Sequence, residues 1–238
     1  MKKYLTIFLL LITWMSNAQG KLDTLYYDIY TCLVTNPFFA VRMRVLYIPD
    51  NIYELKRYKD YNLTTGRIIQ EGGYSKIDYI GNRTKINYEG KTILYGENGN
   101  ILLEQTFRNG KPNGKVIAYD SSGQIIVEMS LKYGLLHGEC KEYNNGVLVR
   151  KDTYVDDKLH GYSTIYYSNG AKHIVAYYEN DELNGPITEF YMSGAVMRTG
   201  SNKNGVAHGD FATYDEAGRI IDMKTAVNGQ WTKKRRRR

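Results

Sequence analysis

Proline and cysteine are scarce in this sequence of 238 residues, which has 4 prolines and 2 cysteines but 23 glycines and 23 tyrosines. Glycine supplies the positive φ angles of turns, and tyrosine suits a half-buried pleated sheet. Hydrophobic residues make up 42% of the chain, which is enough for a packed core. The composition therefore excludes a disordered tail and favours mostly β structure with one or two domains.

The sequence also lacks a run of about 20 apolar residues that could span a bilayer. Its longest apolar run, residues 4–15, follows Lys2 and Lys3 and precedes Ser16-Asn17-Ala18. This order of charged, apolar and small residues is typical of a secretory signal peptide. We predict cleavage after Ala18 and export to the periplasm, the cell surface or the medium. A membrane anchor is the alternative.

A basic groove is not expected, although the formal net charge is +7. Lys2, Lys3 and the six basic residues 233–238 supply eight positive charges, which leaves residues 19–232 at −1. A nearly neutral body argues against a nucleic-acid partner. The basic tail is either solvated or attracted to an anionic envelope surface, at about 1 kcal/mol per basic residue. Those tail residues are Lys233, Lys234, Arg235, Arg236, Arg237 and Arg238.

An internal repeat of 24 residues organises most of the chain, with one repeat of 23. Two glycine columns and one aromatic column agree on this period, which is the signature of a repeat architecture. The first column is Gly90, Gly114, Gly138, Gly161, Gly185 and Gly209; the second is Gly99, Gly123, Gly146, Gly170, Gly194 and Gly218; the aromatic column is Tyr95, Tyr119, Tyr143, Tyr166, Phe190 and Tyr214.

Each repeat has the pattern of a β-hairpin. Residues 161–167 and 171–178 have strand composition, and Ser168-Asn169-Gly170 between them is a turn sequence. A second turn, ending at the first-column glycine, should link one repeat to the next, because Asn or His before Gly tolerates left-handed backbone. We therefore predict structural turns at both glycine columns, and Trp231 covering the last strand edge.

The predicted fold is all-β, an elongated meander of antiparallel hairpins in one curved sheet. Residues 87–232 form the repeat array. Residues 19–86 are less regular, with one degenerate repeat near residues 61–72, and should form a β-rich cap that hides the edge of the array.

The repeats, with residues 158–161 reading Lys-Leu-His-Gly and residues 167–170 reading Tyr-Ser-Asn-Gly, resemble MORN repeats. The bacterial variant found in YwqK-like antitoxin proteins is the most similar form, over about residues 87–231. The resemblance implies a ribbon of hairpins that serves as an interaction or lipid-associated module.

Catalytic and metal-binding motifs are missing from the sequence. It has no nucleophile elbow, phosphate loop, dinucleotide fingerprint or metalloprotease helix. His137, His160 and His208 share one repeat column, and neighbouring repeats lie about 9.5 Å apart, too far for a shared zinc. We expect no enzyme activity, cofactor or metal. The cysteines could form a Cys32–Cys140 disulfide, but a buried inert thiol at Cys140 is the simpler interpretation.

The aromatic column can be interpreted in two ways. Its rings either pack on one face of the ribbon or form an exposed ladder that could hold an extended polymer such as a glycan. We predict a noncatalytic, exported scaffold that binds a protein or an envelope component. A glycan-binding module that uses exposed tyrosines, an antitoxin-like protein that binds a partner, and an enzyme with its site in residues 19–86 are the alternatives.

Overall fold

The computed structural model describes residues 20–27, 32–34, 40–51 and 53–233. All regular elements among them are β-strands, and this part of the chain has no helix that could cross a membrane. The predicted signal peptide and residues 234–238 of the basic tail lie outside the described residues. The chain divides into two compact units, Met1–Gly123 and Gln124–Arg238, which we call the N-terminal and C-terminal units.

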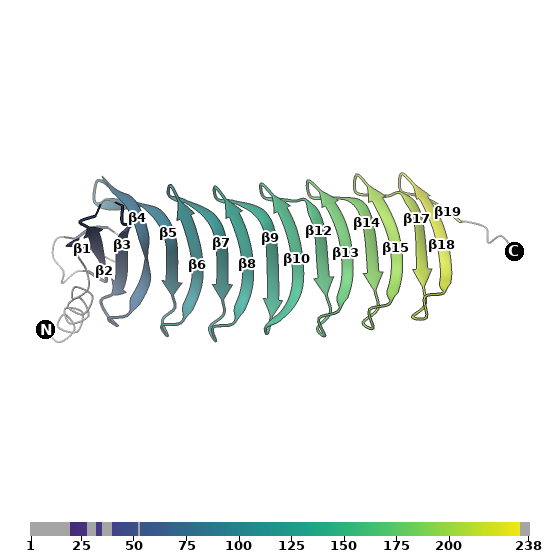
Figure 1. The fold of residues 1–238 in the computed structure, drawn as a ribbon, viewed down its shortest axis with the longest axis horizontal. Coiled ribbons are helices and arrows are strands. Elements are labelled where there is room, and N and C mark those ends of the chain that lie inside the picture. Colours follow the sequence, from purple (N-terminus) through teal and green to yellow (C-terminus); the bar gives the residue numbers. More distant parts are fainter. Residues whose placement is uncertain (1–19, 28–31, 35–39, 52, 234–238) are drawn as a thin grey trace. The chain divides into compact units, whose positions relative to one another are not determined.

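The N-terminal unit is an antiparallel meander in which each strand pairs with the next along the chain (Figure 1). Its strands are β1 (Gly20–Tyr27), β2 (Arg42–Pro49), β3 (Lys56–Asn62), β4 (Ile68–Ile80), β5 (Arg83–Tyr95), β6 (Ile101–Arg108) and β7 (Lys111–Tyr119). The predicted boundary between cap and array, at residues 86 and 87, falls inside β5.

The C-terminal unit continues the same hairpin pattern. β11 and β12 both pair with β10, and β16 and β17 both pair with β15. The predicted all-β meander of antiparallel hairpin repeats is thus confirmed. The strands are β8 (Ile125–Lys132), β9 (Leu135–Asn144), β10 (Val147–Val155), β11 (Lys158–Leu159), β12 (Gly161–Tyr166), β13 (Lys172–Glu179), β14 (Glu182–Phe190), β15 (Val196–Lys203), β16 (Val206–Ala207), β17 (Gly209–Tyr214), β18 (Ile220–Val227) and β19 (Gln230–Lys233).

The second glycine column lies in the turns within the hairpins. At a typical turn the amide of Gly170 donates to the oxygen of Tyr167 at 2.9 Å, and Gly170 has a φ of 82°. The repeat of 23 residues is one residue shorter than the others, and the missing residue is at this turn. There Asn145 and Gly146 alone connect β9 to β10, both with positive φ, which is the pattern of a two-residue type I′ turn.

The first glycine column does not lie in turns, which corrects the sequence prediction. Its glycines lie inside or at the start of strands, at β-bulges. In the repeat of Gly185, for example, Ala176 pairs with Ile187 and Tyr178 with Leu183, so three residues face Tyr177 alone. A bulge of this kind needs a residue with positive φ, which glycine supplies. The strands are β5 for Gly90, β7 for Gly114, β9 for Gly138, β12 for Gly161, β14 for Gly185 and β17 for Gly209.

The turns that link the repeats come four or five residues earlier. Both of their central residues have positive φ, as in type I′ turns, whose twist matches that of the flanking strands. The pairs are Asn109-Gly110, Tyr133-Gly134, Asp156-Asp157, Asn180-Asp181, Asn204-Gly205 and Asn228-Gly229.

Most of the buried hydrophobic residues in the described part of the chain lie in the N-terminal unit. Five consecutive residues of β2, from 43 to 47, are buried, so both faces of this strand are covered. The tip of the long β4–β5 hairpin reaches β1, since the hydroxyls of Tyr27 and Thr84 are 2.8 Å apart. This contact brings the two ends of the β1–β5 sheet together around the inward-facing side chains of β2 and β3.

A buried ion pair lies within this core. The guanidinium of Arg44 donates two hydrogen bonds to the carboxylate of Asp60, at 2.6 and 2.7 Å, and lies over the ring of Tyr58. The side chains of Arg44 and Asp60 are 4% and 1% exposed. The ion pair with Asp60 and the contact of Arg44 with the Tyr58 ring together offset the cost of burying two charges.

Candidate functional site

The candidate catalytic and metal-binding residues do not converge. Within the described residues no three His, Cys, Asp or Glu side chains could hold a metal ion together. The backbone amides of His160 and His208 occupy equivalent bulge positions and donate to Thr153 and Ser201, at 2.8 and 2.9 Å. The His137 imidazole lies 3.2 Å from the carboxylate of Asp156. The geometry of the repeat therefore explains where these histidines lie.

Cys140 is a free, half-buried thiol in β9. Burial raises the pKa of this thiol, and the charges of Glu142 and Asp152 add to the effect. A raised pKa keeps the sulfur protonated near neutral pH, and protonated thiols are poor nucleophiles. Cys140 therefore has the character of an inert core residue.

The aromatic column lies on one sheet face of each unit, which we call the column face. All six of its residues are half-buried, so each ring both packs against neighbours and reaches solvent. Tyr214, for instance, borders a shallow depression together with Val196 and Thr199 of the preceding hairpin. Tyr95 donates a hydrogen bond to Glu71 at 2.6 Å. The packing and binding interpretations are therefore compatible.

Tyrosines that follow column residues connect the repeats. The hydroxyl of Tyr167 donates to the oxygen of Phe190 at 2.7 Å, and that of Tyr191 donates to the oxygen of Tyr214 at 2.8 Å. Each bond joins a hairpin to the next one along the chain. These contacts hold column residues at a fixed spacing, which a repeating contact surface requires.

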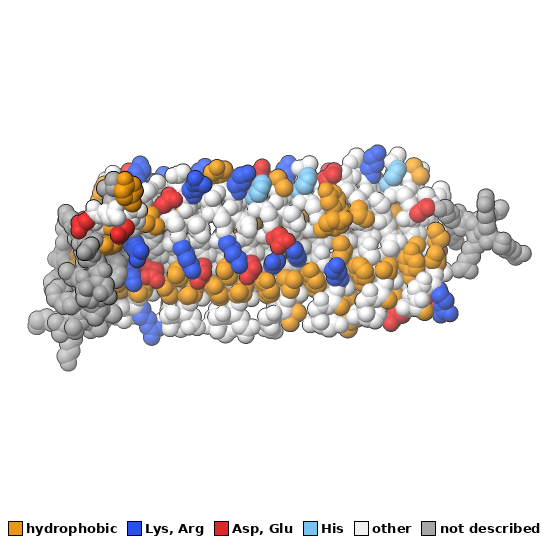
Figure 2. All heavy atoms as spheres, viewed as in Figure 1, with side chains coloured by type: hydrophobic (Ala, Val, Ile, Leu, Met, Phe, Trp, Pro, Cys, Tyr) orange, Lys and Arg blue, Asp and Glu red, His pale blue; other side chains and the backbone are white. Residues whose placement is uncertain are grey.

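Ion pairs lie beside the column on the same face. Lysine and glutamate side chains pair across neighbouring strands, and Figure 2 shows them as blue and red spheres next to a hydrophobic band. The pairs are Lys59–Glu71 at 3.0 Å, Lys91–Glu104 at 2.8 Å and Lys151–Glu139 at 2.5 Å. Burial disfavours the charge on Glu71, but hydrogen bonds from Tyr95 and Lys59 outweigh it and lower the pKa of this carboxyl. The column face thus combines apolar rings with charges that largely balance.

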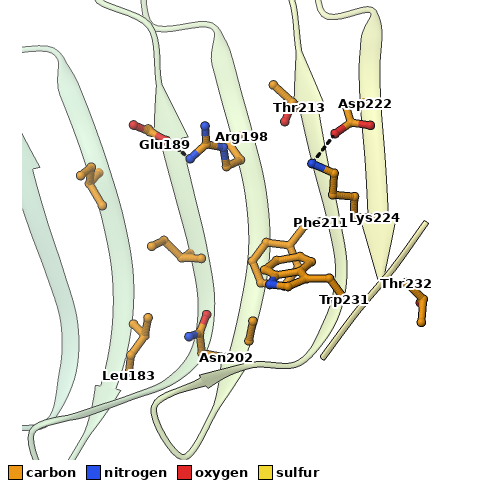
Figure 3. Close-up of a pocket in the computed structure, with 13 residues that line it drawn as sticks. Leu183, Glu189, Arg198, Asn202, Phe211, Thr213, Asp222, Lys224, Trp231 and Thr232 are labelled. Carbon is orange, nitrogen blue, oxygen red and sulfur yellow. Dashed lines mark ion pairs between the residues drawn. The ribbon is translucent and has the colours of Figure 1, made fainter. Parts of the chain in front are cut away.

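The opposite face of the C-terminal unit carries an open groove of about 890 Å³. A polar row lies at one end, where Glu189, Arg198, Thr213 and Asp222 stand opposite one another across four strands (Figure 3). Arg198 pairs with Glu189 at 3.2 Å and Lys224 pairs with Asp222 at 3.1 Å. Acidic and basic side chains therefore balance in the groove.

Two aromatic rings form the floor of this groove. Phe211 and Trp231 pack edge to face with ring centroids 4.8 Å apart, as Figure 3 shows in the middle of the groove. The ring of Phe211 lies over the backbone of Gly200, where an added Cβ would come within 2.1 Å of the ring. Trp231 stands opposite the fully buried Ala226 and is itself 53% exposed. The floor is therefore an aromatic surface that is held in place from below.

A comparison with protein families supports the resemblance of the repeat to MORN repeats. Residues 88–109, which span the second half of β5, the hairpin turn and β6, match the family model of the MORN repeat variant. This segment is therefore similar to one MORN repeat. It matches none of the curated proteins with which it was compared. The resemblance to YwqK-like antitoxin proteins stays a prediction.

The sequence pattern located the column of the repeats but not the groove. The groove uses positions that vary from repeat to repeat, so no column points to it. Trp231, which we expected to cover the last strand edge, packs on the sheet face instead. One signal was available: Gly200 interrupts a strand, and a glycine inside a strand often marks a close approach of other atoms.

Proposed function

We propose that the chain is a noncatalytic, exported repeat scaffold whose column face binds a protein or a component of the cell envelope. The observation that carries this proposal is the recurrence of half-exposed aromatic side chains at fixed spacing, next to paired charges, on one sheet face of each unit. Aromatic residues with a polar surround are typical of recognition surfaces. Repeat arrays commonly bind through such extended faces.

The basic tail has a secondary role in this proposal. Lys233 ends β19, and the following residues 234–238 are Lys-Arg-Arg-Arg-Arg in the sequence. A cluster of this kind attracts the chain to anionic surfaces without selecting a partner. Selectivity would come from the column face.

A binding experiment with purified full-length protein and isolated envelope fractions tests the proposal. Changing Tyr143, Tyr166 and Tyr214 together to alanine should weaken binding at least tenfold, because the rings supply most of the apolar contact area. A second variant, Lys141→Glu with Lys151→Glu, changes two half-buried side chains of the same face and should also weaken binding. Ile165→Ala, at an exposed position of the opposite face outside the groove, is the matched control and should bind like the wild type.

Melting curves of each variant show whether the fold is intact. The proposal fails if both column-face variants fold and bind as tightly as the wild type.

A further inference from the structure

The groove on the opposite face has features that the column-face proposal does not use. It runs across β13, β14, β15, β17, β18 and β19, and strands lie about 4.8 Å apart, so it is roughly 24 Å long. An extended chain of several units fits such a groove better than a compact small molecule does.

The charges of the groove define the chemistry of its occupant. Its two acidic side chains, Glu189 and Asp222, each pair with a basic one. A strongly charged ligand would find no unbalanced charge to attract it. The pairs still offer hydrogen-bond donors and acceptors at their edges, and Thr213 and Asn202 add neutral polar groups.

The aromatic floor defines the shape of the occupant. Trp231 is half-exposed, and Phe211 fixes it from one side. The negative face of an aromatic ring attracts flat arrays of C–H groups. A pyranose ring has such a C–H face, with hydroxyl groups around its rim, and β-1,4 linkage joins these rings into an extended ribbon.

We propose that this groove binds a neutral β-1,4-linked oligosaccharide, which stacks on Trp231 and Phe211 and donates hydroxyl hydrogen bonds to the polar row. The site is distinct from the exposed tyrosines of the alternative glycan-binding interpretation of the sequence. It does not depend on the column-face function, since the two sites lie on opposite faces of the sheet.

Titration of the full-length protein with cellohexaose and chitohexaose tests this assignment. The sequence has two tryptophans, Trp14 and Trp231. In a Trp14→Phe background, the fluorescence of Trp231 reports the groove directly, and calorimetry measures the affinity. We expect saturable binding of at least one hexasaccharide with a change in Trp231 emission, and weaker binding of the corresponding disaccharide.

Matched variants locate the binding. Phe211→Ala and, by calorimetry, Trp231→Ala should each weaken hexasaccharide binding at least tenfold. Asn202→Ala, which keeps the aromatic floor, should weaken it severalfold. Tyr162→Ala is the control, because Tyr162 and Tyr177 form a similar edge-to-face pair on the column face, with centroids 5.1 Å apart. This control should bind within twofold of the wild type.

Three results would overturn the assignment. They are the absence of saturable binding of either hexasaccharide to the wild type, undiminished binding to a folded Trp231→Ala variant, and equal losses for Tyr162→Ala and Trp231→Ala. None of them bears on the column-face proposal, whose readout is attachment to envelope fractions by variants on the other face.

Discussion

Single residues carry unusual energetic weight in the N-terminal unit. Arg44 and Asp60 are buried together, and each is the main neutralising partner of the other. Their geometry could not be predicted from sequence, because a charged residue within a strand is normally expected to face solvent. Only the closing of the β1–β5 sheet, seen in the Tyr27–Thr84 contact, places both side chains inside.

Removing one partner of this pair should be costly. Asp60→Ala leaves the Arg44 charge buried without its carboxylate, so the free energy of unfolding should fall by about 3–5 kcal/mol. Urea denaturation measures this loss. The double variant Arg44→Met with Asp60→Leu fills the same space without charge and should recover most of it. A single variant as stable as the wild type would contradict the role of the pair.

Buried tyrosines should make the N-terminal unit sensitive to alkali. Burial raises the pKa of Tyr61 and of Tyr74 to about 12, whereas tyrosines of an unfolded chain have a pKa of about 10. Between these values the unfolded state has lost the phenolic protons and the folded state keeps them, so the free energy of unfolding falls as pH rises. The loss should reach about 2–3 kcal/mol for each tyrosine.

Denaturation at a series of pH values from 9 to 12 measures this dependence. Tyr61→Phe should make the decline shallower, because its side chain has no proton to lose. An unchanged stability across this range in the wild type would show that the two phenols are not buried as described.

At the scale of the hairpin, the sequence predicted strands and turns within repeats well. Short strands flanked by Asn-Gly or Ser-Gly carry a local signal, since the turn chemistry acts over four residues. The linking turns were misplaced because the first glycine column is so regular. The glycine recurs because each bulge requires it, whereas the residues of the linking turns differ between repeats, for example Asn109-Gly110 and Asp156-Asp157.

The turn glycines give a direct test at this scale. Gly170 has a φ of 82°, and no atom lies within 4 Å of the position of an added Cβ. Gly170→Val should therefore destabilise the protein by about 1 kcal/mol or more through backbone strain alone. Thermal melting measures the effect.

Ser168→Val is the matched control, since Ser168 is exposed in the same turn and is not among the residues with positive φ. It should melt close to the wild type. Equal melting temperatures for Gly170→Val and the wild type would contradict the turn assignment.

At the scale of the whole molecule, the repeat predicted one candidate surface and could not predict the other. A column such as Tyr143, Tyr166 and Phe190 is visible in sequence because the period places equivalent residues on one face. The groove instead combines Phe211 and Trp231 with Gly200 beneath the Phe211 ring, and these residues occupy different positions in their repeats. Only the strand register brings such residues together.

The column face, and not the basic tail, is the proposed source of binding. A chain truncated after Lys233 keeps β19 and loses Lys234 and the four arginines. Contacts of aromatic rings are not screened by salt, whereas attraction of exposed charges over more than about 10 Å is screened at 0.1 M. The two sources of binding therefore respond differently to truncation and to salt.

The most direct measurement is the affinity of the full-length and truncated proteins for isolated envelope fractions, at low salt and at 0.5 M salt. We predict that the truncated protein retains its binding within a few fold and that high salt weakens both proteins only modestly. Loss of binding on truncation, or its disappearance at high salt while both proteins stay folded, would show that the repeats only support the tail and would contradict the account.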